Sequence, residues 1–221
     1  VPAVGLINWD DYYIHSSDDD LWQIDATQLQ RNAFIIAAMA YYLGKAEEDQ
    51  TNLLLSETYA QGNKRLANDL QAAFHQIESQ EDQSIAYKNA SIIIEQAVLR
   101  ESRALLSVTD VVGNSDSVLK KITVVNERLR AKQKMLMNDV DDYYKFKNNT
   151  DKTPKNTLDA KEKAASTKVP KNNPILDDYF GKRRGGAPGI VTHSTMRMEI
   201  FNFVDGKRSY YDIYKAVLAE S

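Results

Sequence analysis

The sequence contains no cysteine, which excludes disulfides and cysteine-based zinc sites. It has only three histidines, so any imidazole chemistry must come from His15, His75 or His193. The longest apolar run covers residues 33–43, whereas a membrane-spanning helix needs about 20 apolar residues. A hydrophobic content of 43% and a net charge of −3 are typical of a globular protein rather than a disordered or membrane-spanning one.

The N-terminal residues combine an apolar segment with an acidic loop. Residues 1–7 read Val-Pro-Ala-Val-Gly-Leu-Ile, which predicts a buried strand over about residues 2–7. Residues 1–25 hold six aspartates and no lysine or arginine, and His15 lies among them. This composition suits zinc, because a neutral imidazole can ligate the ion while a carboxylate orients the ring. The alternative is a solvated histidine in a loop whose Ser-Ser-Asp-Asp-Asp segment caps a helix.

The order of these features resembles the C-terminal end of the catalytic domain of dizinc aminopeptidases. The strand is followed by Tyr-Tyr-x-His-Ser-x-x-Asp-Asp at residues 12–20, then by Ile24-Asp25 and an apolar helix over residues 29–43. The family, metallopeptidase family twenty-eight, also contains glutamate carboxypeptidases and the transferrin receptor ectodomain. The resemblance covers roughly residues 1–46.

The resemblance implies roles for His15, Asp19 and one of two tyrosines of this loop. His15 falls on the last metal ligand of the family, and Asp19 on an aspartate that supports the loop or the ring. The hydroxyl of Tyr12 or Tyr13 would then donate a hydrogen bond to the oxyanion of the tetrahedral intermediate. The family binds two zinc ions, and its other ligands come earlier in its chain than the point where this sequence begins. His75 and His193 do not match those ligands.

We therefore expect the C-terminal part of a zinc-dependent aminopeptidase, an exopeptidase that removes N-terminal residues from peptides with a metal-activated water. Its partners would be the peptide substrate and the missing N-terminal part of the same chain, and a homodimer is left open. The family resemblance implies a secreted or periplasmic location. The chain alone would be incomplete and inactive. The alternative is a non-catalytic helical binding or dimerisation domain of a degenerate metallopeptidase homologue.

The expected fold of this chain is mostly α. Residues 1–46 would supply the last strand, the metal loop and the closing helix of an α/β zinc-peptidase domain. That helix should run from Asp25 or Thr27 to Leu43, and its apolar residues surround the axis, so we expect it to pack against a sheet with other elements on its flanks.

A helical region should follow over residues 47–147. It has no proline, and the spacing of its apolar residues predicts helices at about 48–78, 82–109 and 115–147. Their apolar stripes should be buried by antiparallel packing. The alternative use of these stripes is a partner-binding or dimerising surface. His75 lacks a second ligand-type residue four positions away, so we assign it no function.

The remaining residues divide into two parts. Residues 148–190 read as a basic flexible loop or linker, and the stretch 145–184 has a net charge of +6. Lys182-Arg183-Arg184 could suggest nucleic acid, but interleaved aromatic residues are lacking and the whole chain is acidic, so we expect no nucleic acid partner. Residues 191–221 predict a helix, an Asp-Gly turn and a helix capped by Ser209. This pattern is similar to a small winged-helix-like appendage at the C-terminus of some bacterial aminopeptidases.

Overall fold

The computed structural model describes residue 22, residues 24–171, residue 200 and residues 202–220. These residues are mostly helical and include no strand, which confirms the mostly α prediction for this part of the chain. The strand predicted over residues 2–7 lies outside them. The helices are α1 (Ala26–Lys45), η2 (Glu48–Gln50), α2 (Thr51–Ser79), α3 (Gln83–Leu106), α4 (Thr109–Val112), α5 (Asp116–Asn148), α6 (Ala160–Ser166) and α9 (Tyr210–Leu218).

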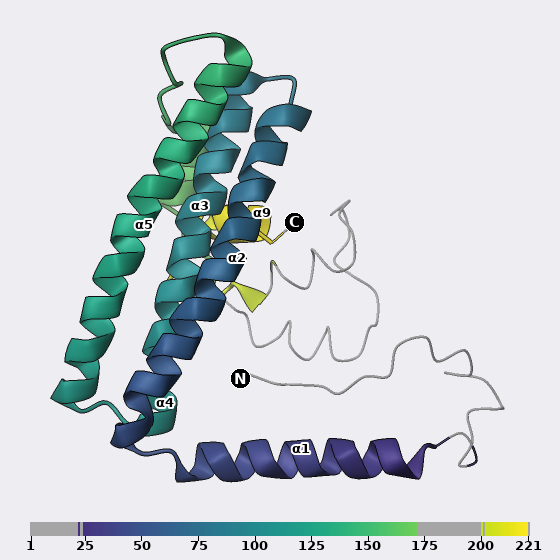
Figure 1. Ribbon diagram of the computed structural model, residues 1–221. Helices are drawn as coiled ribbons and strands as arrows, with labels where there is room; N and C mark the ends of the chain where they lie inside the picture. Colours follow the sequence, from purple (N-terminus) through teal and green to yellow (C-terminus); the bar gives the residue numbers. More distant parts are fainter. Residues whose placement is uncertain (1–21, 23, 172–199, 201, 221) are drawn as a thin grey trace.

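The long helices α2, α3 and α5 form an antiparallel bundle in which α3 contacts both of the others (Figure 1). The helices predicted at 48–78, 82–109 and 115–147 are thereby confirmed to within a few residues. Their apolar stripes meet in one core, where the most deeply buried side chains are Leu66, Ile77, Ile94, Leu105, Val118, Leu129 and Val140. Core packing, and not an exposed partner surface, is therefore the use of these stripes.

Local side-chain chemistry explains where these helices begin and end. The Asp82 carboxylate accepts hydrogen bonds from the backbone N–H groups of Ser84 and Ile85 at 2.9 and 3.1 Å, which starts α3. Ser115 caps α5 by accepting from the N–H of Val118 at 3.3 Å. At the other end of α5, Asn149 adopts a left-handed conformation (φ 46°), which turns the chain out of the helix.

Helix α1 lies across the end of the bundle and extends away from it (Figure 1). It has no buried residue, and Phe34, Ile36 and Tyr41 are 74%, 57% and 71% exposed. The expectation that this helix packs against a sheet with other elements on its flanks is not met by the described residues. The apolar sequence is enough to form the helix, but the described chain supplies no surface to cover it.

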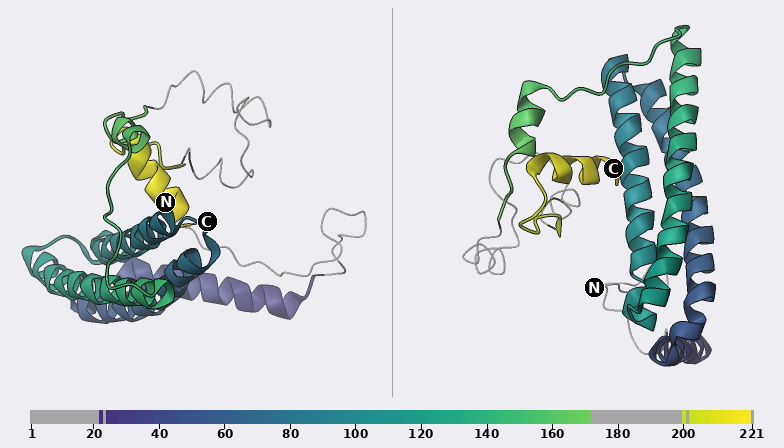
Figure 2. Two further views of the ribbon diagram at one scale, coloured as in Figure 1. Left: turned by 90° about the horizontal axis from the view of Figure 1, so that it is seen from above. Right: turned by 90° about the vertical axis from the view of Figure 1, so that its left-hand side faces the viewer.

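The C-terminal residues pack on one side of the bundle, where α9 contacts α3 and α6 (Figure 2). The predicted Ser209 cap is confirmed, since the Ser209 hydroxyl accepts from the N–H of Asp212 while the Asp212 side chain accepts from the N–H of Ser209. Tyr211 and Ile213 are buried at this contact. Tyr210 and Tyr214 remain about half exposed, so Tyr211 is the tyrosine of this helix that the contact buries.

The segment between α5 and α6 is tied to the bundle. Lys88 of α3 donates to the carbonyl oxygen of Thr157 at 3.2 Å and forms an ion pair with Glu162. The backbone N–H of Tyr210 donates to the carbonyl of Lys168 at 3.0 Å. Over residues 149–171 the predicted basic linker is therefore a surface excursion with fixed contacts. The basic residues Lys182, Arg183 and Arg184 lie outside the described residues.

Replacing Leu129 with alanine should lower the free energy of unfolding by about 2–5 kcal/mol, because it opens a cavity at a side chain that is 1% exposed. Met135 lies on the same helix but is 64% exposed, so Met135→Ala should change stability by less than about 0.5 kcal/mol. Urea unfolding followed by circular dichroism measures both values. Equal effects of the two substitutions would contradict the proposed core.

Candidate functional site

The residues predicted to form the zinc site, namely Tyr12, Tyr13, His15 and Asp19, lie outside the described residues, as does His193. The first described helix comes after them in the sequence: the Asp25 carboxylate accepts from the N–H groups of Thr27 and Gln28 at 2.8 and 3.1 Å and starts α1. In the described part of the chain, no three His, Asp or Glu side chains gather as metal ligands would. The dizinc site therefore stays a prediction.

His75 lies on the exposed surface of α2. The residues one helical turn before and after it are Gln71 and Ser79, which offer no second imidazole or carboxylate on its face. This position agrees with the sequence interpretation, which gave His75 no metal-binding role.

The strongest acid–base candidate among the described residues is Glu101, a carboxylate only 2% exposed inside the bundle. Arg65 of α2 donates to it from Nε at 2.9 Å and from a terminal nitrogen at 2.6 Å. Arg100 donates from Nε to the same carboxylate at 2.9 Å and also binds Asp69 at 2.7 Å. Both oxygens of Glu101 are thus engaged by guanidinium groups.

The electrostatics of Glu101 argue for a structural role. Burial alone would raise its pKa, but the hydrogen bonds and positive charges of Arg65 and Arg100 outweigh that effect, so the pKa lies below its usual value. A general acid or base at neutral pH needs the opposite shift. We conclude that Glu101 joins α2 to α3 as a paired, ionised carboxylate.

Sequence reasoning missed this network, although a signal was present. Glu101 stands on the apolar stripe of α3, three residues after Val98 and four before Leu105. A charged residue at such a position needs a buried partner. The facing residue Gly62 is the second part of the signal, because a Cβ there would lie 2.7 Å from Oε2 of Glu101.

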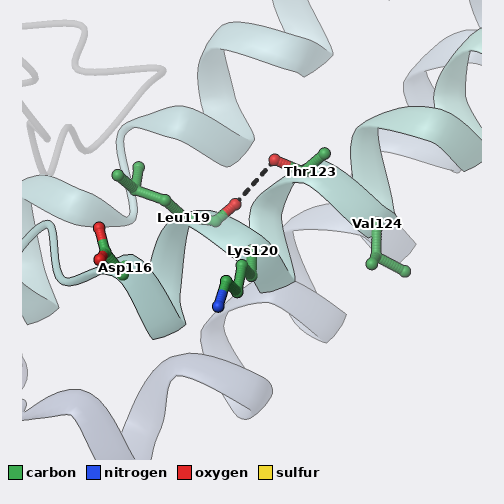
Figure 3. A pocket seen from close by; sticks show the side chains of 5 residues that line it. All are labelled: Asp116, Leu119, Lys120, Thr123 and Val124. Atoms are coloured by element: carbon green, nitrogen blue, oxygen red, sulfur yellow. Dashed lines mark hydrogen bonds between the residues drawn. The ribbon is translucent and has the colours of Figure 1, made fainter.

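A shallow groove runs along the outer face of α5 near its start (Figure 3). Leu119 and Val124 supply apolar surface, and Asp116, Lys120 and Thr123 supply polar groups. The Thr123 hydroxyl donates to the Leu119 carbonyl at 2.9 Å, so it is already satisfied within the helix. We therefore assign no binding role to this groove.

A second depression, a cleft of about 440 Å³, lies between α3 and the C-terminal residues. It is lined by charged side chains from both walls, including Glu95 and Arg103 of α3 and Lys207 of the turn before α9. Sequence analysis could not find it, because its walls are more than 100 residues apart in the chain.

Replacing Gly62 with alanine should destabilise the protein by about 1–3 kcal/mol, because the new methyl group displaces the Glu101 carboxylate from its partners. A glycine-to-alanine change inside a helix ordinarily stabilises by up to about 1 kcal/mol. Gly44→Ala in α1, where nothing lies within 4 Å of the new Cβ, is the matched control and should be neutral or stabilising. Thermal unfolding measures both, and a higher Tm for Gly62→Ala would refute the close contact.

Replacing Glu101 with glutamine should cost roughly 1.5–3 kcal/mol at pH 7, the range for hydrogen bonds to charged groups. Because the folded-state pKa of Glu101 is depressed, its contribution is full above the unfolded-state pKa of about 4.3 and is lost as the pH falls through the lower folded value. The stability gap between wild type and Glu101→Gln should therefore narrow below about pH 4. Exposed Glu127→Gln is the control and should show no such gap in urea titrations across this range.

Two further results bear on the identity of the chain. Among the described residues, no helix is both long and apolar enough to cross a membrane. Comparisons with protein family models, with curated proteins and with solved structures find no match.

Proposed function

We propose that the chain is the C-terminal part of a zinc-dependent aminopeptidase, and that α1 is the closing helix of its α/β catalytic domain. The observation that carries the proposal is the uncovered apolar surface of α1. The large apolar side chains left exposed on this helix and just before it are Ile24, Leu29, Phe34, Ile35, Ile36, Met39, Tyr41, Tyr42 and Leu43.

A helix that is apolar on every side is normally buried in a large protein. Each large apolar side chain left in water forgoes roughly 1.5–3 kcal/mol of burial energy. Between Asp25 and Lys45 the only charged residue is Arg31, so α1 has no charged face to present to solvent. A catalytic domain whose sheet packs on α1 would account for this surface, and the resemblance of residues 1–46 to dizinc aminopeptidases supports that identity.

In this proposal the loop before α1 does the chemistry. Bound zinc would supply a water of lowered pKa and polarise the scissile carbonyl. His15 would hold one ion through a ring nitrogen, and Asp19 would orient the ring or the loop. The hydroxyl of Tyr12 or Tyr13 would donate to the developing oxyanion. A secreted or periplasmic location belongs to the same proposal.

The second candidate is a degenerate homologue without catalysis, in which the helical region serves binding or dimerisation. The same exposed α1 surface would then contact another protein. The two candidates differ in zinc content and turnover, so one set of measurements on the natural protein that carries this chain distinguishes them.

Replacing His15 with alanine in that protein should remove bound zinc and lower aminoacyl p-nitroanilide turnover by about 100-fold or more, because loss even of a group behind the ligand costs 10–100-fold. His75→Ala is the matched control, since His75 is exposed and has no ligand neighbours, and it should leave both values unchanged. Inductively coupled plasma mass spectrometry gives the zinc content.

Two results would overturn the proposal. A wild-type protein without zinc or turnover would favour the degenerate homologue. Zinc-dependent turnover by the isolated 221-residue chain would place the site elsewhere, because one imidazole does not provide the three protein ligands of a catalytic zinc.

A further inference from the structure

The cleft between α3 and the C-terminal residues has two charged walls. On α3 the lining residues Glu95, Leu99 and Arg103 follow one another at single helical turns. The opposite wall consists of the turn with Asp205, Lys207 and Arg208 and the first turns of α9. The Lys215 ammonium of α9 binds Glu95 at 3.0 Å across the cleft, so an ion pair joins the two walls.

All three carboxylates of the cleft are already engaged. Asp205 accepts from the backbone N–H groups of Lys207 and Arg208 at 2.9 and 2.8 Å. Asp212 accepts from the N–H and the hydroxyl of Ser209 at 3.1 and 2.8 Å. Glu95 is paired with Lys215, as described above. None of these carboxylates remains to neutralise another cation in full.

The cations of the cleft differ in whether they have a partner. Lys215 is shared between Glu95 and Asp212, and the Arg208 guanidinium lies over the Phe203 ring at 5.0 Å, with Asp205 at 3.8 Å. Arg103 and Lys207 are exposed, and their side chains form no hydrogen bond or ion pair within the described part of the chain. They line the same cleft from opposite walls, and the apolar side chain of Leu99 lies on the α3 wall beside Arg103.

We propose that this cleft binds a carboxylate carried by a peptide, with Arg103 and Lys207 as the charged ligands and Leu99 as the apolar contact for the neighbouring residue. A guanidinium binds a carboxylate through two parallel hydrogen bonds, and a lysine adds a point charge. The volume of about 440 Å³ lies within the range of small-ligand sites. A singly charged carboxylate fits better than a phosphate, because three carboxylates of the protein also line the cleft.

This inference does not depend on the zinc proposal, since no residue of the cleft belongs to the predicted metal loop. It adds a peptide-binding site on the helical region, remote in sequence from any catalytic residue. The site could receive an acidic side chain or a C-terminal carboxylate, because both present the same group.

The test uses the purified protein and four probes. The acidic peptide is acetyl-Ala-Leu-Gln with a free C-terminal carboxylate, and its amidated form is acetyl-Ala-Leu-Gln-amide. The other two are acetyl-Ala-Leu-Glu-amide, whose only carboxylate is a side chain, and inorganic phosphate. Binding is followed through the backbone amide signals of residues 95–103 and 205–216 in nitrogen-15 correlation spectra. We expect saturable shifts with the acidic peptide and at least tenfold weaker binding by the Arg103→Gln, Lys207→Gln double variant. Because both residues are exposed, this variant should fold normally.

The matched control is the Lys120→Gln, Lys134→Gln double variant, which loses the same charge from exposed positions of α5 and should bind within twofold of wild type. Equal binding of the amidated peptide, an equal loss in the control, or tighter binding of phosphate would overturn the proposal. Binding of acetyl-Ala-Leu-Glu-amide as tight as that of acetyl-Ala-Leu-Gln would show that a side-chain carboxylate is sufficient, and weaker binding would identify the C-terminal carboxylate as the ligand; both results support the site. His15→Ala should leave all of these binding affinities unchanged, so a failure of the zinc proposal can be distinguished from a failure of the peptide-binding proposal.

Discussion

The burial of α3 is the constraint on which the rest of the bundle depends. Helices α2, α5 and α9 all contact it, and its buried residues run along its whole length from Ala86 to Leu105. An interior helix of this kind ordinarily carries no charge, because an ionised group removed from water needs full compensation. Glu101 meets that condition through Arg65 and Arg100, whose guanidinium groups remain about half exposed and so keep part of their hydration. The absence of a side chain at Gly62 leaves the space that the carboxylate occupies.

Hydrogen bonds hold the segment that connects α1 to the bundle. The Tyr42 hydroxyl of α1 donates to the Gln50 side chain at 3.2 Å, and the Ser115 hydroxyl donates to Glu48 at 2.9 Å. Hydrogen bonding from Ser117 and Ser115 also lowers the pKa of Glu48, so this carboxylate stays ionised in the joint. The connection of α1 to α2 is short and tied to the start of α5.

Much of the bundle could be predicted from the sequence, because the spacing of apolar residues along a helix determines which side chains face the core. Val118, Ile122, Leu129 and Val140 repeat at helical intervals and are buried as that repeat requires. The helix α1 was predicted correctly, but the sheet expected to cover it stays a prediction, since an apolar sequence predicts burial without identifying the covering surface. The contacts of Lys88 with Thr157 and Glu162 could not be predicted from a lysine-rich composition, because they depend on how the chain returns to α3. The predicted zinc ligand His15 lies outside the residues that could test it.

Glu101 and Tyr211 show how burial and neighbouring charges shift the pKa values of ionisable groups in the helical region. Its one deeply buried carboxylate is saturated by two guanidinium groups and has a lowered pKa, so it is unsuited to proton transfer near neutral pH. Tyr211 of α9 has its pKa raised to about 12 by burial and nearby carboxylates, which keeps its hydroxyl protonated. Within the part of the chain that the structure describes, the exposed side chains of Arg103 and Lys207 at the α3–α9 cleft have no ion-pair partner, and they supply the charge on which the proposed peptide site depends. In the proposed hydrolase, the reacting groups would come from the acidic loop before α1 and from the domain that α1 would complete.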